Sequence, residues 1–65
     1  MSEVALWNAV IVQAIEDLFR GNDEERRDAF CWIFENNPDF RRVCDYARID
    51  PMYVRKNVFG KIVNG

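Results

Sequence analysis

The side chains best suited to chemistry lie in the C-terminal half of the chain, where arginine, lysine, asparagine and tyrosine recur between residues 41 and 61. Arginine can bind guanine through two hydrogen bonds, asparagine can do the same for adenine, and cationic side chains can reach phosphates. The pattern therefore predicts a surface for duplex DNA. Its candidate residues are Arg41, Arg42, Arg48, Tyr53, Arg55, Lys56, Asn57 and Lys61. The alternative is that these side chains are the solvated faces of two amphipathic helices.

Two short helices would have to position these residues. The first is expected over residues 38–47, with Asn37 as its cap, and the second over residues 51–63, with Asp50 as its cap. A proline follows each cap at the first helical position, where the missing N–H costs nothing. The short connection between them predicts that the two helices pack closely.

This junction is similar to the helix-turn-helix of phage and bacterial regulators. Cys44 supplies the small residue, Ala47 the apolar residue before the turn, Ile49 the one inside it and Val54 the anchor in the second helix. The turn of that motif usually opens with glycine, and here it opens with Arg48. The resemblance implies that the last helix is a recognition helix, with an altered turn.

The first half of the chain predicts a longer helix over residues 3–20. Ser2 is suited to cap it, and apolar residues recur along it at helical spacing. We expect that stripe to contain Trp7, Val10, Ile11, Ala14, Leu18 and Phe19. Gly21 is expected to end the helix by adopting the left-handed conformation.

A second helix is predicted over residues 23–35, where Asn22 and Glu25 have the spacing of a capping box. It contains a run of six residues, 29–34, without a polar side chain. A one-sided helix needs only about three apolar residues in six, so part of this run is either wrapped by other helices or exposed for a partner. The candidate interface residues are Phe30, Trp32 and Ile33.

Together these segments predict an all-α fold, a compact bundle of about four short helices that forms one domain over residues 1–65. No segment has 18 consecutive apolar residues, so no membrane partner is expected. Cys31 and Cys44 stand alone, without a CxxC motif. We expect two reduced, buried thiols in a cytoplasmic protein, with a disulfide as the alternative.

Charge divides the chain into two unequal halves. Residues 1–37 contain eight acidic and three basic side chains, a sum of −5, and residues 38–65 contain three acidic and six basic ones, a sum of +3. The total of −2 argues against a general nucleic-acid binder, whereas the basic half favours a local DNA surface. A DNA-binding form is expected to be a homodimer, because a monomer has too few phosphate contacts.

The composition argues against catalysis. The chain has no histidine and only one serine, which removes Ser-His and Cys-His pairs and histidine-containing metal sites. Its three glycines form no phosphate-binding loop. We therefore expect no enzyme activity, no cofactor and no metal.

A wider pattern combines LWNAVIVQAIEDL, ERRDAFCWIF and DFRRVCDYARIDPMYVR. It resembles a group of short, mostly uncharacterised proteins of proteobacteria and their phages. The resemblance implies a phage or prophage accessory protein with a helix-turn-helix-like C-terminal half, and it implies no established activity. Three readings follow: a DNA-binding regulator, a module that binds a host or phage protein through its acidic and aromatic surfaces, and an assembly component.

Overall fold

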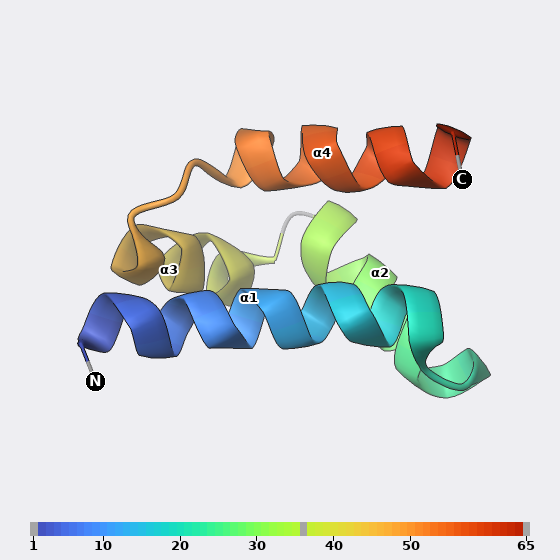
Figure 1. Ribbon diagram of the computed structural model, residues 1–65, viewed down its shortest axis with the longest axis horizontal. Coiled ribbons are helices and arrows are strands. Elements are labelled where there is room, and N and C mark those ends of the chain that lie inside the picture. The colour runs from blue at the N-terminus through green and yellow to red at the C-terminus, as the bar shows by residue number, and fades with distance from the viewer. Residues whose placement is uncertain (1, 36, 65) are drawn as a thin grey trace.

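The structure is a computed structural model that describes residues 2–35 and 37–64; Met1, Asn36 and Gly65 lie outside the described residues. The described chain is all-α, as predicted (Figure 1). Its helices are α1 (Glu3–Arg20), α2 (Asp23–Phe34), α3 (Pro38–Ala47) and α4 (Pro51–Asn64). Each boundary lies within one residue of its predicted position.

At the helix starts, side-chain oxygens accept hydrogen bonds from backbone N–H groups that have no acceptor within the helix. The Ser2 hydroxyl accepts the Ala5 backbone N–H at 3.2 Å at the start of α1. At α2 the predicted capping box is present, because the Asn22 side chain accepts the Glu25 N–H at 2.8 Å and the Glu25 carboxylate accepts the Asn22 N–H at 3.1 Å. The Asp50 carboxylate accepts the Met52 N–H at 2.9 Å at the start of α4. These starts were readable from residue type and spacing alone.

The reason for glycine at position 21 differs from the predicted one. Gly21 has φ −74° and ψ 172°, which is extended backbone that any residue can adopt. The prediction of a left-handed residue was therefore wrong. A Cβ at this position would lie 2.5 Å from the backbone oxygen of Asp17 and 2.8 Å from the Cβ of Glu25. Space, rather than dihedral freedom, requires glycine where α1 turns into α2.

The left-handed residue is instead Arg48, with φ 58° and ψ 41° at the end of α3. The Arg48 N–H donates to the Asp45 carbonyl at 3.1 Å, and the Ile49 N–H donates to the Cys44 carbonyl at 2.9 Å. This pair of bonds is the Schellman pattern that usually places glycine at the left-handed position. The turn thus has the backbone conformation that glycine usually adopts, but its left-handed residue is an arginine.

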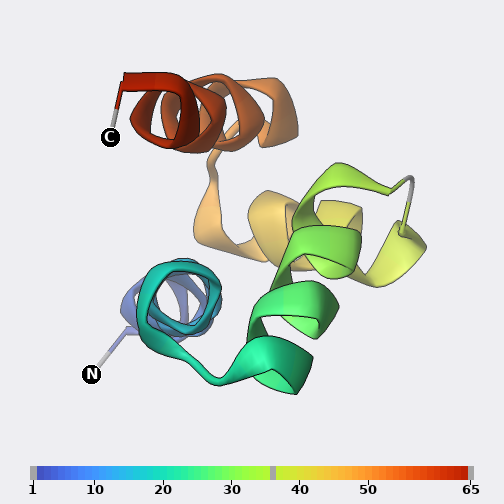
Figure 2. The ribbon, with the colours of Figure 1, turned by 90° about the vertical axis from the view of Figure 1, so that its right-hand side faces the viewer.

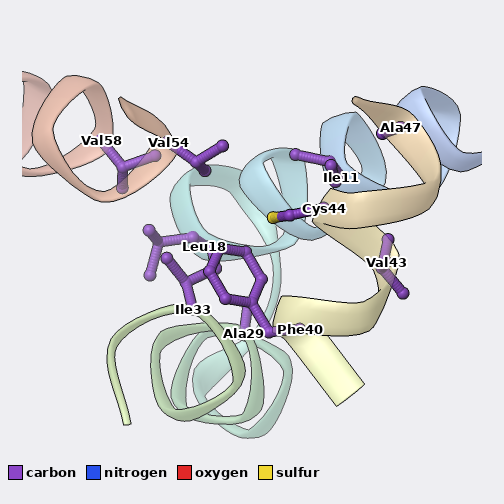
Figure 3. Packing of buried hydrophobic residues seen from close by; sticks show 10 residues of the cluster. All are labelled: Ile11, Leu18, Ala29, Ile33, Phe40, Val43, Cys44, Ala47, Val54 and Val58. Carbon is purple, nitrogen blue, oxygen red and sulfur yellow. The ribbon is translucent and has the colours of Figure 1, made fainter. Parts of the chain in front are cut away.

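One apolar core joins the four helices (Figure 3). Its buried members are Ile11, Leu18, Ala29, Ile33, Phe40, Val43, Cys44, Ala47, Val54 and Val58. Phe40, Ile33 and Cys44 are fully buried at its centre. Two residues of the predicted α1 stripe, Val10 and Phe19, are exposed instead. Ten buried residues within 2–35 and 37–64 make a small core, and large apolar side chains stay exposed elsewhere on the surface.

The helices are not equally embedded in this core. α1 packs along both α2 and α3, whereas α4 packs mainly on α3 and stands apart from α1 (Figures 1 and 2). α4 contributes only Val54 and Val58 to the buried core. The opposite side of α4 is therefore available to other molecules.

Candidate binding surfaces

Arg55 was predicted to contact DNA, and its side chain lies partly inside the protein. Its Nε donates to the backbone oxygen of Ile33 at 2.7 Å. Its guanidinium carbon lies 5.2 Å from the centre of the Phe40 ring, within range for a cation–π contact. Its Nη2 is buried without a hydrogen-bond partner among the described residues. The Arg55 side chain thus connects α4 to the end of α2 and to the core, so its guanidinium is not free to read a base.

Four other predicted DNA residues lie together on one side of α4. Tyr53, Lys56, Asn57 and Lys61 are exposed and, with Gly60 and Asn64, line a shallow hollow of about 580 Å³. We call these six residues the polar side of α4. The Asn57 amide donates to the Tyr53 carbonyl at 2.7 Å, which holds the asparagine along the helix surface. This side carries two cations and no acid.

The remaining DNA candidates lie outside α4. Arg41 and Arg42 are exposed on α3, and Arg48 is exposed in the turn that follows it. All three guanidinium groups belong to exposed residues. Seven of the eight predicted DNA residues are therefore at the surface, and Arg55 is the exception.

The three predicted interface residues of α2 lie in different environments. Phe30 is 45% exposed, whereas Ile33 is fully buried in the core and has no surface for a partner. Trp32 is half-buried; its indole N–H donates to the Asp39 carboxylate at 3.0 Å, and its ring packs on Phe40 in an edge-to-face arrangement with 5.0 Å between the ring centres. The apolar run of α2 is thus partly core and partly surface, a combination of the two expected alternatives.

A second surface of α4 was not predicted as a site. Met52, Phe59 and Val63 are 65%, 58% and 64% exposed, and Lys56 lies among them. Positions 52, 56, 59 and 63 are separated by four, three and four residues, so they share one side of the helix. We call these four residues the apolar side of α4; Lys56 borders both sides. The spacing was visible in the sequence, but Val54, Val58 and Ile62 offered a competing stripe for the core.

Ile62 follows Val54 and Val58 at helical spacing, but it is 43% exposed. It lies in a groove of about 990 Å³ formed by the ends of α1 and α4 and by α2, together with Phe30. Four cations and one acid line this groove: Arg20, Arg26, Arg27, Lys61 and Glu16. Figure 2 shows α4 standing apart from α1 on this side. Because α4 does not close onto α1 here, Ile62 stays at the surface.

A third surface lies between α1 and α2. It is a shallow groove of about 650 Å³ with apolar side chains along its length and acidic side chains around them. The apolar and neutral residues are Leu6, Ala9, Val10, Gln13, Ala14, Ala29 and Trp32, and the acids are Asp17, Glu25, Asp28 and Asp39. Among the residues that the structure describes, no basic one lines it. We call it the acid-rimmed groove.

Both cysteines are free; Cys44 is buried as expected, whereas Cys31 is only half-buried. Burial raises the pKa of the Cys44 thiol; the nearby Arg55 guanidinium opposes this shift only in part. Burial also raises the pKa of Cys31, and the Glu35 carboxylate raises it further. Because the thiolate is the reactive form, neither cysteine has the environment of a nucleophile.

The comparisons with known proteins supply no assignment. The chain matches no protein-family model, and neither the curated proteins nor the solved structures contain a significant match to it. Within residues 2–35 and 37–64, no group of three histidine, cysteine or acidic side chains could hold a metal ion. None of the described helices is long and apolar enough to cross a membrane. Function must therefore be argued from the surfaces described above.

Proposed function

We propose that this protein is a small, non-enzymatic interaction module that docks on another protein chain through the apolar side of α4. The observation that carries the proposal is the exposure of Met52, Phe59 and Val63 together on one side of one helix. Exposed apolar residues are ordinary when scattered, whereas a continuous patch is typical of an interaction surface. Amphipathic helices bind grooves through anchors with this spacing.

The folding of the chain does not explain this patch. α4 is held by the buried side chains of Val54 and Val58 and by Arg55, which lie on other sides of the helix. A polar residue at position 59 would leave those contacts in place. Met52 and Phe59 share a hollow with Phe34 of α2 yet stay 65% and 58% exposed, so burial of this side by a partner would remove apolar surface from water.

The test is site-specific photo-crosslinking in the native cells of the protein. A photoreactive phenylalanine analogue replaces Phe59 in one variant and exposed Arg41 of α3 in the control. We expect a discrete protein adduct from position 59, which is lost when Met52→Ser is added, and none from position 41. Equal labelling at both positions, or none at position 59, would remove the basis of the proposal.

A second candidate function is DNA binding by the polar side of α4, as the helix-turn-helix resemblance implies. The supporting observation is that Tyr53, Lys56, Asn57 and Lys61 share one exposed side of α4, with no acid among them. Asparagine suits adenine and lysine suits phosphate or guanine. Either function would suit a cytoplasmic phage or prophage accessory protein of the group that the sequence resembles.

This candidate is tested by the fluorescence anisotropy of labelled random-sequence duplex DNA at low and moderate salt. Binding that weakens steeply with salt, and that is lost in Lys61→Glu, supports a DNA surface on the polar side of α4. Lys61 is the informative position because it lies outside the apolar side, whereas Lys56 borders both. No binding at low salt would exclude this candidate.

A further inference from the structure

We propose that the partner of α4 is a second copy of this chain, and that the apolar side of α4 docks into the acid-rimmed groove of that copy. The inference rests on the proposed function, since it names the partner of the same surface. It comes from two features of one molecule that match each other in charge, length and apolar spacing.

Charge is the first match. The apolar side of α4 carries one charge, the +1 of Lys56, and α4 has no acidic residue. The acid-rimmed groove has four acids and no base, a sum of −4. Lys56 lies within the apolar side of α4, where it would reach the rim as the neighbouring apolar side chains enter the groove. Opposite charges placed around an apolar contact fix its register and exclude partners of the wrong sign.

Length and spacing are the second match. The groove follows α1 from Leu6 to Asp17, and the apolar side of α4 runs from Met52 to Val63. Both spans cover eleven helical steps, or about 17 Å at 1.5 Å per residue. Leu6 and Val10 are exposed in the groove, one turn apart, so they offer apolar contacts to the three anchors of α4.

The groove must belong to another copy. Val54 and Val58 hold α4 on the core, whereas Met52, Phe59 and Val63 are exposed, and no residue of α4 lines the groove. The same α4 cannot enter the groove on its own α1 without leaving the core. The contact therefore joins two different surfaces of two copies, which produces either a reciprocal dimer or a head-to-tail chain.

Sedimentation velocity over a range of concentrations at low salt tests this contact. Asp28→Lys changes the charge of the groove from −4 to −2, and Lys56→Glu changes that of the apolar side of α4 from +1 to −1. Both residues are exposed, so both variants are expected to fold, with circular dichroism as the check. We expect each reversal to raise the dissociation constant of self-association about tenfold or more. Lys61→Glu is the matched control, because it makes the same charge change outside the apolar side.

Mixing the two reversed variants gives the decisive result. The Asp28→Lys protein keeps a native α4 and the Lys56→Glu protein keeps a native groove, so an equimolar mixture regains one native contact. We expect the mixture to associate where each variant alone does not. A wild-type protein that stays monomeric at every concentration would overturn the inference, and so would reversals that act no more strongly than Lys61→Glu.

The photo-crosslinking experiment separates this inference from the proposed function. A crosslink from position 59 to a peptide containing Leu6 or Val10 of a second copy supports both. A crosslink only to a different protein overturns the second-copy partner and leaves the proposed function standing. The absence of any adduct at position 59 overturns both.

Discussion

Replacing Arg55 with methionine should remove the polar link between α4 and the end of α2. The substitution deletes a 2.7 Å hydrogen bond to the Ile33 carbonyl and a contact of 5.2 Å with the Phe40 ring, while keeping an unbranched apolar stem. A hydrogen bond from a charged group contributes about 1.5–3 kcal/mol and a cation–π contact about 0.5–2 kcal/mol. Removing the buried, unpaired Nη2 also removes a destabilising contribution, which offsets this loss by about 1–3 kcal/mol. We therefore expect a net loss of about 2 kcal/mol in the free energy of unfolding.

That loss is large for this chain. A core of this size provides a net stability of about 3–5 kcal/mol, and 2 kcal/mol corresponds to a fall in Tm of roughly 8–16 °C. Urea denaturation followed by tryptophan fluorescence measures the change. Trp32 is a suitable reporter because it lies edge-on against the same Phe40 ring.

The adjacent residue provides the matched control. Lys56→Met makes the same change of charge and side-chain class at an exposed position, and it should alter stability by no more than about 0.5 kcal/mol. If Arg55→Met is as stable as Lys56→Met, the Arg55 side chain points to solvent and our account of α4 fails. If Arg55→Met instead unfolds the protein and Lys56→Met does not, charge reversal at position 55 cannot be used to test DNA binding.

Three further predictions test the backbone and the core. Arg48→Gly should stabilise the protein by about 0.5–1 kcal/mol in urea denaturation, because glycine adopts φ 58° without steric cost; Arg48→Ala, which keeps that cost, should not. Gly21→Ala should destabilise it by about 1–3 kcal/mol in thermal unfolding, because the new Cβ would lie 2.5 Å from the Asp17 backbone oxygen; an unchanged Tm would refute this. The free energy of unfolding should fall as pH rises above about 9.0, the ordinary pKa of the thiol, because Cys44 ionises in the unfolded chain while folding raises its pKa. Cys44→Ala should reduce the slope of that fall, and an identical slope would contradict the assignment.

The helices were predictable because local rules decide them. Ser2, Asn22, Asn37 and Asp50 are good caps with acceptors at the right spacing, and each begins a helix as expected. The conformation of the turn residues was less predictable. Gly21 and Arg48 exchange the roles that their residue types suggest, because Gly21 is fixed by a steric contact between two helices and Arg48 by the Schellman bonds around it.

The candidate surfaces could not be predicted from local sequence rules, because tertiary packing decides which side chains are exposed. Arg55, Lys56 and Asn57 are adjacent polar residues, and only tertiary packing separates Arg55, which bonds the Ile33 carbonyl, from its exposed neighbours. In the same way Ile33 and Phe30 lie in one apolar run, yet one is fully buried and the other is 45% exposed. The acid-rimmed groove combines side chains from three helices, so it could not be read from the spacing within any one of them.

Lys56 makes the two proposed roles of α4 physically dependent on each other. It borders both the polar side and the apolar side of the helix, so a copy whose α4 lies in an acidic groove has that lysine engaged by carboxylates rather than by phosphates. DNA and self-association would then compete for one cation, and each would lower the apparent affinity of the other. Salt separates them, since phosphate contacts weaken steeply with salt whereas burial of Met52, Phe59 and Val63 does not. Self-association that persists at high salt, together with lost DNA binding, would identify the apolar side as the dominant surface of α4.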